Sequence, residues 1–181
     1  MRLFVALPLP AEIRSALLRW TKSCGAQPGL RWTPEDQLHI TLHFLGEVAE
    51  ANLDAVLNAI AAIAAPAFPI AFDRVEVLGR AGVLVARATP SPPFVGLAQA
   101  VRSRLGIFSE ILETGRAFHP HVTLARARHG GAVPKPRALP PLPELKFTAA
   151  CFRLVRSELR SEGAIHTAIR EWKLERAGAP L

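Results

Sequence analysis

Two histidine–threonine pairs carry the groups in this chain that could do chemistry. His39 and Thr41 are separated by one residue, and His121 and Thr123 repeat the same spacing in the second half. Histidine can accept or release a proton near neutral pH because its ordinary pKa is about 6.5. A threonine hydroxyl can donate a hydrogen bond to an oxygen that carries negative charge. The two pairs therefore favour acid–base chemistry on an oxyanion.

Both pairs lie in segments that predict β-strands. Residues 38–46 read LHITLHFLG, and residues 118–126 read FHPHVTLAR. Strict alternation of apolar and polar residues is typical of a half-buried strand, whose side chains point to opposite faces in turn. We expect Ile40, Leu42 and Phe44 to be buried. The imidazoles and hydroxyls then share the opposite face.

The rest of the chain predicts helices and further strands around these two segments. Helices are indicated at 10–22, 50–65 and 94–105 by their apolar spacing and their flanking prolines. Outside the two His-x-Thr segments, apolar and alternating runs predict strands at 3–7, 31–33, 68–78, 83–88, 147–159 and 164–174.

The two halves look like distant copies, with one His-x-Thr strand in each. We predict an α+β fold in a single bilobal domain spanning 1–181. Its two pseudo-symmetric lobes would face each other with antiparallel sheets across a central cleft, with the helices outside. That arrangement would bring the two pairs together.

Composition limits the classes of function. The chain has 181 residues, a net charge of +7 and a pI near 10.7, with the excess of Lys and Arg on residues 74–181. This charge favours a polyanionic partner such as RNA, although a solvated basic surface is an equal interpretation. Two cysteines are too few for a disulfide framework, and no long uncharged apolar segment is present. We expect a cytoplasmic protein that does not enter membranes.

If the pairs converge on one phosphate, they could cleave a phosphodiester in line. One histidine would take a proton from the attacking oxygen and the other would protonate the leaving oxygen. The hydroxyls of Thr41 and Thr123 could bind the non-bridging oxygens. Arg126 could add positive charge, but it lies on the opposite strand parity from Thr123 and needs a bend to reach the cleft. The scheme uses no metal and no cofactor.

The sequence resembles the two-histidine (2H) phosphoesterases, and among them the RNA 2′,3′-cyclic phosphodiesterases, which are also known as 2′-5′ RNA ligases. The segments that carry the resemblance are LFVAL at 3–7, RWT at 31–33, HITLHFLGE at 39–47 and PHVTLAR at 120–126. It implies hydrolysis of a terminal 2′,3′-cyclic phosphate on RNA to a 2′-phosphomonoester, with ligation as a possible second activity. Separately, we expect the protein to act as a monomer. The resemblance also implies that His39 is the proton donor and His121 the proton acceptor. From their chemistry, we expect Thr41, Thr123 and Arg126 to bind the substrate.

Two other functions remain open at this point. His39, His43, His119 and His121 could be imidazole ligands of a metal-dependent hydrolase, although no Asp-rich or Cys-rich element accompanies them. A non-catalytic RNA-binding module would instead use the basic half and the cleft. We interpret His43 and His119 as ordinary half-exposed residues, and His129 and His166 as incidental.

Overall fold

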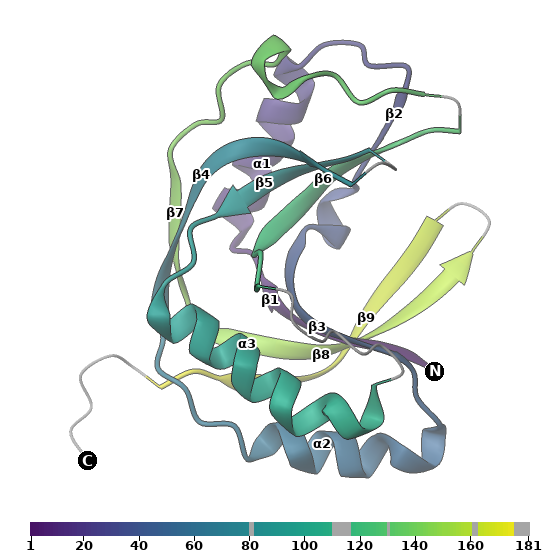
Figure 1. The fold of residues 1–181 in the computed structure, drawn as a ribbon, viewed down its shortest axis with the longest axis vertical. Helices are drawn as coiled ribbons and strands as arrows, with labels where there is room; N and C mark the ends of the chain where they lie inside the picture. The colour runs from purple at the N-terminus through teal and green to yellow at the C-terminus, as the bar shows by residue number, and fades with distance from the viewer. Residues whose placement is uncertain (80–81, 110–116, 130, 161–162, 176–181) are drawn as a thin grey trace.

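One antiparallel sheet organises the computed structural model, which describes residues 1–79, 82–109, 117–129, 131–160 and 163–175. Within these residues nine strands form one sheet: eight pair in the order β7-β4-β5-β6-β3-β1-β8-β9, and the ninth, β2, pairs with the C-terminal end of β6 (Figure 1). The strands are β1 (Arg2–Pro8), β2 (Leu30–Trp32), β3 (His39–Glu47), β4 (Phe68–Leu78), β5 (Val83–Ala88), β6 (His121–Ala127), β7 (Leu145–Ala149), β8 (Cys151–Arg160) and β9 (Gly163–Lys173).

The sheet has two halves that meet at a single residue pair. Strands β1, β3, β8 and β9 form one half, and β2, β4, β5, β6 and β7 form the other. The registered contact between β3 and β6 is Ile40 opposite Val122. Figure 1 shows the two halves diverging from this junction. The expected lobes are therefore two halves of one continuous sheet, each with its own His-x-Thr strand, and the predicted antiparallel α+β fold is confirmed.

The helices pack against one face of this sheet. Helix α1 (Ala11–Ser23) follows Pro10 and buries Ile13, Leu17 and Trp20. Helices α2 (Leu53–Ala61) and α3 (Pro92–Leu105) lie side by side, and α3 contacts the junction strand β3 (Figure 1). The predicted helix 50–65 is shorter than expected. It begins as a 3₁₀ turn at Glu50–Asn52 and ends at Ala61, several residues ahead of Pro66.

The predicted strand 147–159 is divided in the structure. Strand β7 ends at Ala149 and pairs with β4, whereas β8 begins at Cys151 and pairs with β1 and β9. The chain thus crosses between the two halves at Ala150. An apolar run can continue through such a crossing because both strands remain in the core.

Strand β1 is buried on both faces, in keeping with its continuous apolar sequence. Leu3, Val5 and Leu7 belong to the main core that the helices cover. Phe4 and Ala6 join Val155 in a second, small apolar cluster. Because strand residues alternate between faces, this cluster lies on the face away from the helices. Cys24 and Cys151 are both free thiols. None of the helices in the described ranges has the length and apolar content to cross a membrane.

Candidate active site

The junction between the two halves places both His-x-Thr pairs on one face of the sheet. Ile40 and Val122, the middle residues of the two pairs, oppose each other and are completely buried. In an antiparallel pair, the residues flanking such a contact point to the other face. His39 therefore lies opposite Thr123 and Thr41 opposite His121, all four half-buried. His39 and His121 are then diagonal neighbours, and such residues lie roughly 7–8 Å apart, with their Cβ atoms somewhat closer. Both imidazoles can thus contact one phosphate.

A β-bulge follows the pair in each strand. On β3, Thr41 is registered with Ala6 and His43 with Val5, which leaves Leu42 as the extra residue. On β6, Thr123 is registered with Val85 and Ala125 with Leu84, which leaves Leu124 extra. An extra residue reverses which face the following side chains occupy. The two bulges fall at equivalent positions, as expected for distant copies.

The bulge in β3 overturns two expectations. Phe44 was predicted to be buried, but it is 39% exposed. His43 was predicted to be half-exposed, but it is buried at 2% exposure. Simple alternation is wrong beyond Thr41 because the bulge exchanges the two faces. The same change of parity in β6 brings Arg126 to the face of His121 and Thr123, and it supplies the bend that Arg126 needs.

The rings of His39 and His121 are held in the same way. The Nδ1–H of His39 donates to the carbonyl of Gln37 at 2.7 Å, and the Nδ1–H of His121 donates to the carbonyl of His119 at 2.7 Å. A carbonyl oxygen can only accept, so Nδ1 must carry the hydrogen in both rings. This leaves both Nε2 atoms available to accept or release a proton.

His39 lies in an aromatic cluster that lowers its basicity. Phe4 stacks on its ring at 4.9 Å, and His166 packs edge-on at 5.4 Å between ring centroids. Burial lowers the pKa of His39 to about 4; the hydrogen bond to Gln37 opposes this shift, and charge on His166 or His121 adds to it. His166, expected to be incidental, is therefore a neighbour of the site. Nothing in its local sequence indicated this, because strand β9 joins the site through tertiary pairing.

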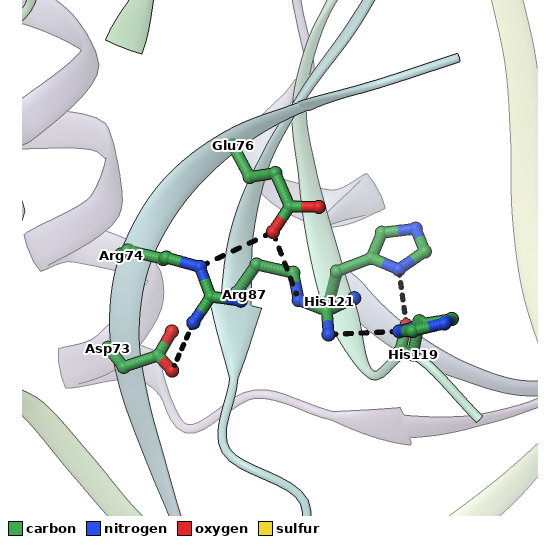
Figure 2. A network of polar contacts seen from close by, with 6 residues as sticks. All are labelled: Asp73, Arg74, Glu76, Arg87, His119 and His121. Carbon is green, nitrogen blue, oxygen red and sulfur yellow. Dashed lines mark hydrogen bonds and ion pairs between the residues drawn. The ribbon is translucent and has the colours of Figure 1, made fainter. Parts of the chain in front are cut away.

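His121 lies instead beside cations. Arg87 is its registered partner on β5 and is itself buried at 7% exposure. Burial lowers the pKa of His121, the charges of Arg87 and Arg126 lower it further, and Glu76 opposes them. Figure 2 shows that Arg87 belongs to a chain of polar contacts that runs from Asp73 through Arg74 and Glu76 to His119. Sequence reasoning missed Arg87. A charge inside the apolar strand VLVARA was the signal that could have found it.

Each histidine lines its own hollow. A pocket of about 390 Å³ on the His39 side is lined by residues that include Phe4, Arg14, Arg153 and His166. A pocket of about 340 Å³ on the other side is lined by residues that include Thr41, Phe44, His119 and His121. Both volumes lie in the range typical of small-molecule sites.

The metal alternative needs a cluster of ligands. In the described ranges, no group of three or more His, Cys, Asp or Glu side chains is spaced to hold a metal ion. The four histidines considered as ligands, His39, His43, His119 and His121, form no such group in these ranges.

This protein has an α+β fold whose antiparallel sheet presents two His-x-Thr pairs at its central junction. These features place it in the two-histidine class of phosphoesterases. Within that class, the chain belongs to the LigT-like phosphoesterase family, and the sequence model of that family matches residues 7–85. It is 32% identical to the RNA 2′,3′-cyclic phosphodiesterase of Thermus thermophilus, over 96% of this chain and 90% of the relative. It is 30% identical to the enzyme of that name from Escherichia coli, over 96% of both chains.

Solved structures agree with this assignment over nearly the whole chain. The apo form of E. coli LigT superposes with a TM-score of 0.84 at 29% identity, covering 96% of this chain and 97% of LigT. A crystal structure of a T. thermophilus protein superposes with a TM-score of 0.83 at 32% identity, covering 98% of this chain and all of the other.

Proposed function

We propose that this protein is an RNA 2′,3′-cyclic phosphodiesterase that hydrolyses a terminal cyclic phosphate to a 2′-phosphomonoester without a metal. The observation that carries the proposal is the pairing of Ile40 with Val122, which sets two imidazoles with free Nε2 atoms on one face. Relatives that match nearly the whole chain bear this enzyme's name. LigT of E. coli has also been crystallised with 3′-AMP and with phosphate.

In the proposed reaction a water molecule attacks phosphorus opposite the 3′-oxygen of the terminal ribose. The Nε2 atom of His121 accepts the proton that the water loses as the new P–O bond forms. The P–O3′ bond breaks, and the Nε2–H of His39 protonates the 3′-oxygen. The phosphate remains on the 2′-oxygen, and the two histidines end in exchanged protonation states that solvent resets.

The charge that develops on the non-bridging oxygens needs nearby donors. The hydroxyls of Thr41 and Thr123 lie beside the imidazoles on the same face and can donate to these oxygens. Arg126, moved to this face by the bulge in β6, adds a positive charge that attracts the phosphate.

The surroundings of the histidines suit these roles. The lowered pKa of His121 keeps its Nε2 free to act as the base at neutral pH. His39 must be protonated to act as the acid, although burial lowers its pKa in the free protein. An anionic phosphate beside the ring favours the protonated form, so we expect substrate binding to raise the pKa of His39, which then takes up a proton from solvent.

The partner in this proposal is an RNA or oligonucleotide that ends in a 2′,3′-cyclic phosphate. The net charge of +7 favours such a polyanion. We further propose that the protein acts as a monomer in the cytoplasm. The comparisons do not favour a metal-dependent hydrolase or a non-catalytic RNA-binding module.

Product analysis tests the proposal. An oligonucleotide that ends in a 2′,3′-cyclic phosphate is incubated with the protein in excess chelator, and the phosphate position on the product is identified by NMR. A 2′-phosphate is expected. Loss of turnover in chelator would favour the metal-dependent alternative, and binding without turnover would favour the RNA-binding module. A 3′-phosphate product would contradict the assigned direction of ring opening.

A further inference from the structure

The orientation of His121 depends on a short segment that precedes β6. The carbonyl that accepts its Nδ1–H belongs to His119, so the ring is held only as well as residue 119 is held. Residues 118 and 120 are anchored to the core: the Phe118 ring packs edge-on against buried Phe94 at 5.1 Å, and the carbonyl of Pro120 accepts from the amide of Ala88 at 3.0 Å. The anchor of His119 itself is a side chain on β5.

That side chain is Arg87. Its Nη2 lies 3.1 Å from Nδ1 of His119, and its Nε lies 3.4 Å from a carboxylate oxygen of Glu76 (Figure 2). A guanidinium only donates, so Nδ1 of His119 must be the acceptor. The ring hydrogen of His119 therefore resides on its Nε2. Burying a guanidinium is unfavourable unless it is paired, and Glu76 with His119 provides the pairing. Glu76 thus holds the guanidinium of Arg87, and Arg87 in turn holds the ring of His119.

The other half of the site has an equivalent device with different chemistry. The acceptor for His39 is the carbonyl of Gln37, and the Gln37 amide Nε2 donates to the carbonyl of Ala164 on β9. In both halves, the side chain of the residue two positions before the histidine makes a hydrogen bond to another strand of the same half. Different side chains thus hold residues 37 and 119, whose carbonyls orient His39 and His121. This recurrence indicates that a fixed carbonyl is needed to orient each imidazole.

We propose that Arg87 is a positioning residue for the reaction: through His119 it fixes the carbonyl that orients His121 with Nε2 toward the phosphate. Glu76 acts one step further out by orienting the guanidinium. The inference rests on the proposed function, because it takes His121 to be the base. Its structural part, the effect of Arg87 on the His121 ring, stands without that function.

The first test replaces Arg87 with methionine, which keeps the length of the side chain and removes its donors. We expect kcat to fall about 10- to 100-fold with KM changed less than about threefold, since a misplaced base slows chemistry more than binding. Nitrogen NMR of the imidazoles at pH 8 should show the His121 ring as a mixture of tautomers, with His39 unchanged. The matched control is Arg74→Gln, because Arg74 also contacts Glu76 but not His119.

A second pair of variants applies if Arg87→Met does not fold. His119→Asn keeps an acceptor near the position of Nδ1, whereas His119→Phe removes it and keeps the backbone carbonyl. We expect the Asn variant to retain at least tenfold more kcat than the Phe variant, and to keep the His121 tautomer that the Phe variant loses. Equal losses in the two would mean that His119 acts through Nε2, which overturns the proposal.

Two further outcomes also count against it. A folded Arg87→Met variant with the wild-type tautomer and wild-type kcat would show that Arg87 does not position His121, as would an equal loss in Arg74→Gln. Failure of the proposed function is distinguishable, because the wild-type protein would then lack turnover while the tautomer change in Arg87→Met persists.

Discussion

Ile40 and Val122 oppose each other at the one registered pair that joins β3 to β6 in the described residues, and each is the central residue of a His-x-Thr sequence. Each half of the sheet therefore brings one His-x-Thr sequence to this junction. Each imidazole lies opposite the hydroxyl of the other strand, and the helices cover the opposite face. The predictions below depend on this relation.

The first prediction concerns the two imidazoles. Replacing His39 or His121 with alanine removes one proton transfer, so we expect kcat to fall by about 10²–10⁴ in each variant. The double variant should lose less than the product of the single losses, because the two groups act in one step. Hydrolysis of a cyclic-phosphate-terminated oligonucleotide measures this. His129→Ala, an exposed histidine beyond β6, is the control. Turnover near the wild-type rate in either site variant would remove that histidine from the mechanism.

The second prediction concerns the hydroxyls. Thr41→Val and Thr123→Val keep the shape of the side chain and remove the donor. We expect each to lower kcat by about 10²–10³, the loss typical of one donor to a developing negative charge. Thr41→Ser and Thr123→Ser keep the donor and should retain most activity. If valine and serine variants behave alike, the threonines serve strand structure and do not bind the phosphate.

The third prediction concerns the pH dependence of the rate. His39 must be protonated to act, and its pKa in the free protein is lowered to about 4. Because bound phosphate raises that pKa, the alkaline fall in kcat, which reports the complex, should lie at higher pH than the alkaline fall in kcat/KM, which reports the free protein. Steady-state rates from pH 4 to 9 measure both. Alkaline limbs that coincide would mean that the substrate does not raise the pKa of His39.

The fourth prediction concerns stability. The pKa of His39 is about 4 when folded and near 6.5 when unfolded, so between these values the unfolded chain binds a proton that the folded chain does not. This contribution to the free energy of unfolding is present above pH 6.5 and is lost as the pH falls toward 4, by about 2–3 kcal/mol. Burial shifts the pKa of His121 and His166 in the same direction.

Urea unfolding at pH 7.5 and pH 5 measures this loss. The variant His39→Gln has no imidazole to protonate, so its free energy of unfolding should change less between the two pH values than that of the wild type. An equal change in both proteins would place the acid sensitivity elsewhere in the fold.

The sequence by itself determined the chemistry and the local strands. Whether a side chain lies on the face of Ile40 or of His39 follows from alternation between nearest neighbours, which is a local property of an extended chain. His39, Thr41, His121 and Thr123 could therefore be assigned to one kind of face before any pairing was known. Helix α1 could likewise be predicted from the sequence, because its apolar spacing and Pro10 are local signals.

Only the tertiary structure decided how these local pieces combine. The bulges at Leu42 and Leu124 arise from pairing with β1 and β5, so alternation could not foresee that Phe44 is exposed and His43 buried. His166 reaches His39 because β8 and β9 complete the first half of the sheet. Arg87 faces His121 because β5 pairs with β6. Each of these contacts joins residues far apart in the chain, and their strand register is set by the packing of the whole core.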